Sequence, residues 1–108
     1  GPPAKNYVDY PDFAKKVVKR VLQKKSDAGI LICGSGAGMA MTANKFKGIR
    51  AVQCYNKKNT ILSRQHNNAN IICLGSRMIK NKEAFSFIKY FFKTKFDGGR
   101  HQQRIDKI

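Results

Sequence analysis

The segment Gly29-Ile30-Leu31-Ile32-Cys33-Gly34-Ser35-Gly36-Ala37-Gly38-Met39 indicates the fold class of this chain. Its short apolar run, bounded by glycines, is typical of a buried parallel strand. The glycines at every second position then predict a tight loop that is lined by main-chain N–H groups and leads into a helix. Because a helix N-terminus carries a partial positive charge, such a loop favours a bound anion.

A thiol stands at the carboxyl end of this predicted strand, which is where open α/β sheets bind their ligands. The positive end of the following helix favours the thiolate of Cys33, whereas burial in a strand favours the thiol, and the sequence leaves the balance open. A cysteine in a strand is often only a packing residue. Its position directly before Gly34-Ser35-Gly36 favours a functional role for Cys33.

Length and composition indicate one folded domain. The 108 residues are enough for a single hydrophobic core, and we expect one domain over residues 1–108. Hydrophobic residues make up 42% of the chain and aromatic residues 10%, which favours a folded protein over a disordered one. No apolar run approaches the about 18 residues of a membrane span, and residues 1–6 lack the apolar core of a signal peptide. We therefore expect a cytoplasmic protein without a membrane partner.

The cysteines suggest neither disulfides nor a metal centre. Cys33, Cys54 and Cys73 are odd in number, form no CxxC pair, and each lies in an apolar, strand-like context. We expect reduced thiols, and we predict no metal-ligand cluster and no cofactor. Cys54 and Cys73 are predicted to be packing residues only.

The charge balance is strongly basic, with 22 Lys and Arg against 6 Asp and Glu and a formal net charge of +16. Such a surface attracts anions, from sugar phosphates to nucleic acids. Most of these residues are lysines in Lys/Asn-rich stretches such as 56–59 and 80–82, and arginine interleaved with aromatic residues is sparse. We therefore favour solvated lysine faces over a nucleic-acid surface, and expect no nucleic-acid partner.

Apolar periodicity predicts alternating helices and strands. Residues 1–6 have the composition of a linker or remnant. A helix is expected from Tyr10 to near Lys25, with its apolar side at Ala14, Val17, Val18, Val21 and Leu22. The other predicted elements are a strand over 29–33, a helix from the glycine loop to about Phe46, a strand over 49–54, a helix over 59–66, a strand over 70–75 and a helix over 82–93. The last helix carries Phe85, Ile88, Phe91 and Phe92 on or near one face.

This alternation predicts an α/β, Rossmann-like fold of three layers, with a parallel sheet and right-handed crossovers. Three strands make a small sheet, however. The strand ending at Cys33 would lie at an edge or be half covered, although its sequence is typical of an interior strand. We therefore expect strands that precede residue 7 to lie beside it.

Six ordered blocks of sequence resemble the ribose-5-phosphate isomerase B family, which includes the galactose-6-phosphate isomerase subunits. The blocks are 29–39, Ala43-Asn44-Lys45 with Gly48-Ile49-Arg50-Ala51, Ser63-Arg64-Gln65-His66-Asn67, Ala69-Asn70, Leu74-Gly75-Ser76-Arg77 and Gly98-Gly99-Arg100-His101-Gln102-Gln103-Arg104. The resemblance runs from about Val8 to the C-terminus and keeps spacing as well as residue type.

The resemblance implies a five-stranded sheet in the complete fold, with an additional N-terminal strand-helix-strand of about one βαβ unit. That unit carries an Asp-His pair for the substrate and is missing from this sequence. We favour an incomplete record of a complete enzyme over a truncated relative, because the retained site residues match the family.

The resemblance also implies an activity of the pentose phosphate pathway, the interconversion of ribose 5-phosphate and ribulose 5-phosphate through a cis-enediolate. Cys33 matches the base at C2, and the main-chain N–H groups of Gly34, Ser35, Gly36, Ala37 and Gly38 match the hole for the enediolate oxygens. The Ser35 hydroxyl would shuttle a proton between the substrate oxygens or polarise them, and it would also suit the N-cap of the helix. His66 matches the ring opener.

The remaining residues implied by the resemblance bind the substrate. Asn67 matches a ligand of substrate hydroxyls, Tyr10 contributes to the pocket wall, and Arg77, Arg100 and Arg104 match the phosphate ligands, with His101 as a fourth. The planar fork of arginine suits phosphate. Residues 95–108 would reach a partner subunit, so that the complete site resembles one built across a homodimer or a dimer of dimers.

A second interpretation keeps the same fold without the reaction. The missing Asp-His unit and the charge of +16 are also compatible with a non-catalytic relative that acts as a partner subunit or as a basic nucleic-acid-binding module. Binding of an oligonucleotide that weakens steeply with salt would identify the basic module.

Overall fold

The computed structural model describes residues 10–108, and side chains from residue 11 onward. Its elements follow the predicted alternation: α1 (Tyr10–Leu22), β1 (Gly29–Cys33), α2 (Ala37–Ala43), β2 (Ala51–Gln53), α3 (Lys57–Gln65), β3 (Ile71–Gly75), α4 (Asn81–Lys93) and α5 (Arg100–Ile105). Tyr10 begins α1, but its side chain lies outside the described residues, so its predicted place in a pocket wall is not addressed.

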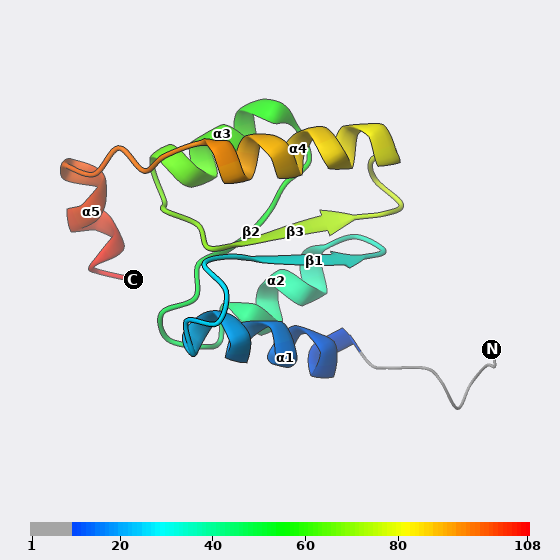
Figure 1. Cartoon of the computed structure of the whole chain (residues 1–108), viewed down its shortest axis with the longest axis horizontal. Helices are drawn as coiled ribbons and strands as arrows, with labels where there is room; N and C mark the ends of the chain where they lie inside the picture. Colours follow the sequence, from blue (N-terminus) through cyan, green and yellow to red (C-terminus); the bar gives the residue numbers. More distant parts are fainter. Residues whose placement is uncertain (1–9) are drawn as a thin grey trace.

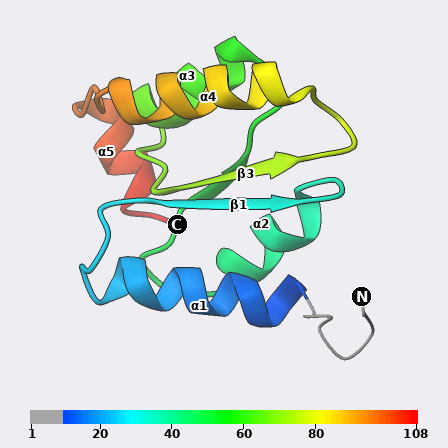
Figure 2. The same ribbon diagram turned by 45° about the vertical axis from the view of Figure 1, so that its right-hand side comes forward.

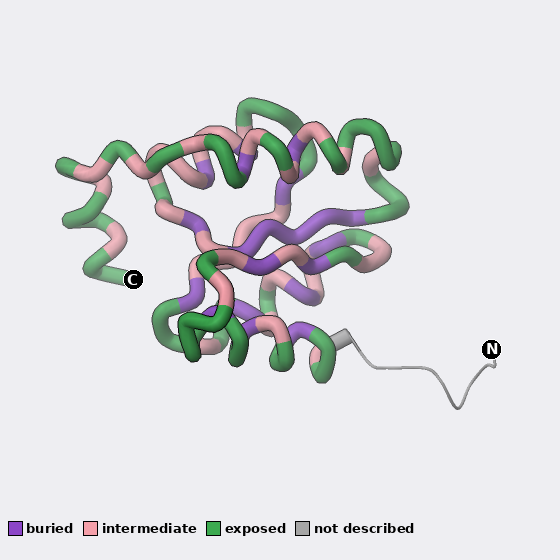
Figure 3. The backbone as a smooth tube through the Cα atoms, viewed as in Figure 1, coloured by how far each residue is buried: buried purple, intermediate pink, exposed green. Residues whose placement is uncertain are grey.

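The three strands form one parallel sheet in the order β1-β3-β2. Helices α1 and α2 cover one face and α3 and α4 cover the other, which gives the predicted three-layer arrangement (Figures 1 and 2). All five residues of β3 are buried, and the tube of Figure 3 is purple along this strand. Among residues 10–108, β1 pairs with β3 alone, so its predicted edge position is confirmed.

Two hydrophobic clusters hold the layers together, one on each face of the sheet. On the first face, Ala14 and Val18 of α1 pack with Leu31 and Ile71. On the second, Phe87 and Phe91 of α4 pack with Ile72 and Leu74. Successive residues of β3 therefore pack into opposite clusters, because side chains alternate between the two faces of a strand.

The helix boundaries differ from the sequence prediction by a few residues. Helix α1 ends at Leu22 rather than near Lys25, because Lys24 adopts a left-handed conformation with φ 59°. Leu22 was predicted on the apolar side of this helix, but it is 43% exposed. Helix α2 ends at Ala43 instead of continuing to Phe46, and α4 begins at Asn81, one residue early.

Two predicted segments around β2 also shift. The strand predicted over 49–54 is limited to Ala51–Gln53, because the backbone before it is held by side chains: Asn70 Oδ1 accepts from the Arg50 N–H and Asn44 Oδ1 from the Ala51 N–H, both at 2.8 Å. The helix predicted over 59–66 begins at Lys57, because the Asn56 side chain caps it by accepting from the Asn59 N–H at 2.7 Å. The strand predicted over 70–75 begins at Ile71.

The buried face of α4 was predicted only in part, since Phe91 is buried and Ile88 packs against the core as expected. Phe85 and Phe92 are exposed, at 73% and 56%, whereas Phe87 and Phe91 are buried. The helix is rich in aromatic residues on both sides, so its sequence alone did not show which side faces the sheet. No helix in the described part of the chain is long and apolar enough to cross a bilayer.

Candidate active site

Cys33 stands where β1 breaks into the glycine loop, as predicted. The side chain is half-buried, and its Sγ accepts a hydrogen bond from the Gly36 N–H at 3.1 Å. Gly36 has φ 84°, a left-handed conformation that glycine adopts without strain, and the turn made there starts α2 at Ala37. The loop thus folds back so that a main-chain donor faces the thiol.

The end of β3 holds this loop from the other side. The Ser76 N–H donates to the Cys33 carbonyl at 2.7 Å, and the Arg77 N–H donates to the Gly34 carbonyl at 3.0 Å. A Cβ on Gly75 would lie 2.5 Å from the Ser35 carbonyl oxygen, so only glycine allows the two backbones to approach this closely. The carboxyl ends of β1 and β3 are therefore locked together.

Arg77 lies directly beside the glycine loop. A Cβ on Gly34 would be 3.0 Å from Cζ of the Arg77 guanidinium, so the planar group packs against the Gly34 backbone. The structure thus joins Cys33, the loop residues 34–38 and Arg77 into one group. We call this group the thiol cluster.

Ser35 is exposed at the tip of the loop. Its Oγ accepts from the Ala37 N–H at 3.3 Å, so the hydroxyl satisfies a free donor at the start of α2 and still faces solvent. Gln53, at the end of β2, donates from Nε2 to the Ser35 carbonyl at 2.5 Å. No role was predicted for Gln53, although its place at the carboxyl end of a neighbouring strand could have indicated one.

A second group gathers at the end of α3. His66 is the C-terminal cap of α3, and its ring stacks on that of His101 from α5, with centroids 4.2 Å apart and planes inclined by 11°. The Asp97 N–H donates to the Gln65 carbonyl at 3.0 Å, which ties the segment before α5 to the end of α3. We call His66, Asn67, Asp97 and the α5 residues Arg100, His101 and Arg104 the histidine cluster.

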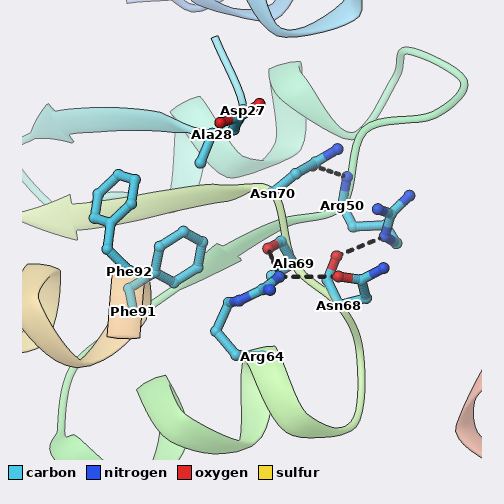
Figure 4. A pocket seen from close by; sticks show the side chains of 9 residues that line it. All are labelled: Asp27, Ala28, Arg50, Arg64, Asn68, Ala69, Asn70, Phe91 and Phe92. Atoms are coloured by element: carbon cyan, nitrogen blue, oxygen red, sulfur yellow. Dashed lines mark hydrogen bonds between the residues drawn. The ribbon is translucent and has the colours of Figure 1, made fainter. Parts of the chain in front are cut away.

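Two arginines brace the turn that follows His66. Arg64 Nη1 donates to Asn68 Oδ1 at 3.0 Å and to the Ala69 carbonyl at 2.6 Å, while Arg50 Nε donates to the Asn68 carbonyl at 2.8 Å. Asn68 has φ 47°, so the chain reverses sharply here. These arginines line a pocket of about 370 Å³ at the amino end of the sheet, where Phe91 and Phe92 form the opposite wall (Figure 4). Burial and the neighbouring Arg50 lower the pKa of Arg64.

Within one chain the two clusters lie at opposite ends of the sheet. The thiol cluster follows the carboxyl ends of β1 and β3, whereas α3 runs back along the sheet and leaves His66 at the amino end, beside α5 (Figures 1 and 2). A parallel strand rises about 3.3 Å per residue, so the five residues of β1 separate the clusters by roughly 15 Å. Cys33 and His66 of one chain are therefore not neighbours.

The surroundings of the titratable groups differ between the clusters. Burial lowers the pKa of His101, and the adjacent His66, Arg100 and Arg104 lower it further, against a smaller opposing effect of Asp97. Burial raises the pKa of Cys54, and raises that of Cys73 to about 12 with the help of Cys54 and Cys33. Both thiols are enclosed in the core, which agrees with their predicted packing role.

The histidine cluster also brings together three potential metal ligands, which corrects the prediction from the sequence that there is no metal-ligand cluster. One ligand atom from each of His66, Asp97 and His101 lies within 4.8 Å of the other two. In the sequence, only its position directly before Gly98 and Gly99 marks Asp97 as a candidate site residue. The neighbouring Arg100 and Arg104 make this place better suited to an anion than to a cation.

Comparison with known proteins identifies close relatives. Residues 1–108 match the family model described as Ribose/Galactose Isomerase. The chain is 50% identical over 101 residues to a probable ribose-5-phosphate isomerase B of Mycoplasma genitalium, covering 93% of this chain and 66% of that protein. It is 44% identical over 100 residues to ribose-5-phosphate isomerase B of Escherichia coli, covering 93% and 67%. The chain therefore spans about two thirds of the length of these relatives.

Solved structures show the same likeness. A ribose 5-phosphate isomerase of Thermotoga maritima superposes with a TM-score of 0.92 at 48% identity, covering 99% of this chain and 74% of that one. The Mycoplasma genitalium enzyme with bound ribulose-5-phosphate gives a TM-score of 0.87 at 50% identity, covering 93% and 66%. The Rossmann-like fold predicted from the sequence is thereby confirmed.

Proposed function

Since this chain belongs to the ribose/galactose isomerase family, we propose that it catalyses the interconversion of ribose 5-phosphate and ribulose 5-phosphate. The observation that carries the proposal is the thiol cluster. In this cluster the half-buried Cys33 accepts a hydrogen bond from a main-chain N–H at the carboxyl end of a parallel strand. The chain is also 50% identical to an enzyme whose structure was solved with ribulose-5-phosphate. The cytoplasm is the proposed compartment.

The proposed reaction moves one proton between neighbouring carbons. With the sugar in its open form, the Cys33 thiolate removes the proton from C2, and the C2 electron pair forms a double bond to C1 as the charge moves to the carbonyl oxygen. The resulting cis-enediolate is stabilised by the N–H groups of the loop residues 34–38. The proton returns to C1 while the Ser35 hydroxyl passes the other proton between O2 and O1.

The histidine cluster supplies the remaining roles in the proposal. His66 opens the sugar ring by moving a proton from the O1 hydroxyl to the ring oxygen, and Asn67 binds substrate hydroxyls. Arg100, Arg104 and His101 bind the phosphate together with Arg77 of the thiol cluster. Arginine donates two parallel hydrogen bonds to a phosphate, so this set suits a sugar phosphate.

We further infer that each complete site combines the thiol cluster of one chain with the histidine cluster of a second copy. The separation of the two clusters by about the length of β1 supports this arrangement, because a pentose phosphate is too short to bridge it. Residues 95–108 then act as the segment that reaches the partner, in a homodimer or a dimer of dimers. A two-fold axis would create two such sites at once.

The direct test is turnover of ribose 5-phosphate by the wild-type chain and by Cys33→Ala. Loss of a positioned base typically costs a factor of about 10² to 10⁴, so kcat should fall by that much. Cys73→Ala is the matched control, because it removes a thiol that is enclosed in the core and has no part in the proposed reaction. Equal activity of Cys33→Ala and wild type would refute the assignment of the base.

A further inference from the structure

Gln53 links β2 to the glycine loop through one hydrogen bond. Its Nε2 donates to the Ser35 carbonyl at 2.5 Å, across 18 positions in the sequence. Its Cγ lies 3.4 Å from the position that a Cβ on Gly36 would occupy, so the aliphatic part of the side chain packs against the same turn. Gln53 thus reaches the loop with both its apolar stem and its amide.

The Ser35 carbonyl and the Gly36 N–H belong to the same peptide group. In a trans peptide these two groups point in opposite directions, and no cis peptide occurs among the described residues. The carbonyl accepts from Gln53, and the N–H on the other side donates to Cys33 Sγ at 3.1 Å. One peptide plane therefore connects the Gln53 amide to the thiol, and each hydrogen bond polarises the other.

This peptide needs an external constraint to keep its orientation. Gly36 has φ 84° and, lacking a Cβ, can adopt other backbone conformations, and Ser35 at the tip is exposed. Gln53 is well placed to supply the constraint, since its backbone is fixed twice. It pairs in register with Cys73 of β3, and its carbonyl accepts from Asn59 Nδ2 at 3.2 Å.

We propose that Gln53 is a positioning residue that fixes the peptide between Ser35 and Gly36 and so directs the Gly36 N–H toward the Cys33 sulfur. The inference rests on the proposed function, in which that N–H stabilises the thiolate and then an enediolate oxygen. Gln53 itself does not touch the reacting atoms. Its contribution is the direction of a main-chain donor.

The test uses Gln53→Met, which keeps the length of the side chain but removes the donor, and Gln23→Met as the control at an exposed position. Alkylation of Cys33 by iodoacetamide near neutral pH, followed by mass spectrometry, reports the reactivity of this thiol, since Cys54 and Cys73 are buried. A hydrogen bond contributes about 1 kcal/mol, so Gln53→Met should alkylate about fivefold more slowly. Gln23→Met should match the wild type.

Nuclear magnetic resonance of the free chain distinguishes the loss of this one hydrogen bond from a general loss of structure. The Gly36 amide proton should shift upfield and exchange faster in Gln53→Met, with the amides of α1 unchanged. An unchanged Gly36 resonance together with an unchanged alkylation rate would overturn the inference. Both measurements are made without substrate, so this failure would leave the proposed isomerase activity standing.

Discussion

At the scale of single residues, three cysteines of one small domain occupy three different environments. Cys54 and Cys73 are 1% and 0% exposed, and burial raises the pKa of both thiols. Cys33 is half-buried and faces a main-chain N–H at the end of its strand. The chemistry of a thiol follows its surroundings, and only the surroundings of Cys33 offer both access and a donor.

His101 carries a prediction about pH. Because partial burial and the adjacent His66, Arg100 and Arg104 disfavour its cation, the pKa of His101 should lie below the ordinary value of 6.5. As the pH falls through 6.5, the unfolded chain takes up this proton before the folded chain does. The contribution of His101 to stability is therefore complete above that pH and is lost as the pH falls below it.

A titration of the histidine ring protons by nuclear magnetic resonance measures this midpoint. Arg104→Gln is the control, since removal of one nearby positive charge should raise the midpoint, and addition of inorganic phosphate should raise it as well. A His101 midpoint at or above 6.5 in the free chain would show that the cation is not disfavoured there.

At the scale of elements, the junction of β1 and β3 depends on Gly75. A Cβ there would meet the Ser35 carbonyl oxygen at 2.5 Å, a contact with backbone that no rotation of a side chain relieves. Gly75→Ala should therefore lower the free energy of unfolding by about 1 to 3 kcal/mol, the usual range for overpacking. Urea denaturation measures the change.

Ser76→Ala is the neighbouring control for this substitution. Ser76 is exposed, and changes at such positions usually alter stability by no more than about 0.5 kcal/mol. If Gly75→Ala and Ser76→Ala were equally stable, the close approach of the β3 end to the glycine loop would not be a real constraint.

The sequence predicts these elements well where one periodicity dominates. Val18 lies in the core as expected, because the apolar positions of α1 lie on one side of the helix. Helix α4 offers two aromatic sides, and only the tertiary packing selects Phe87 and Phe91. Boundaries shift where side chains hold the backbone, as Asn56 does before α3.

The candidate site was predicted in composition but not in arrangement. The residues of both clusters could be named from the motifs, but the motifs grouped Arg77 with Arg100 and Arg104, whereas in the structure Arg77 lies against Gly34 of the glycine loop. The distance between Cys33 and His66 follows from topology, since a helix after a parallel strand returns to the amino end of the sheet. Gln53 and Arg64 act on backbone carbonyls, and such contacts leave no motif in a sequence.

At the scale of the whole molecule, β1 lies at the edge of the sheet that residues 10–108 form, and this position bears on association. Ile32 is 54% exposed on this strand, which pairs with β3 alone within residues 10–108. An unpaired apolar edge favours pairing with other chains. Ile32→Lys should therefore reduce association of the 108-residue chain at high protein concentration, measured by sedimentation velocity.

Leu22→Lys is the matched control, because it adds the same charge at an exposed leucine of α1, away from the strand edge. Both variants raise the net charge equally, so a difference between them reports the edge itself. Equal association of Ile32→Lys and Leu22→Lys would mean that β1 is not the surface that joins the chains.

The proposed isomerase site is shared by two copies of the chain, and complementation between two inactive variants tests this sharing. Cys33→Ala and His66→Ala should each be inactive with ribose 5-phosphate. When the two variants are refolded together, half of the random dimers are mixed, and each mixed dimer has one intact site of two, so about a quarter of wild-type activity should return. A mixture that remains as inactive as its components would contradict a site built from the thiol cluster of one chain and the histidine cluster of the other.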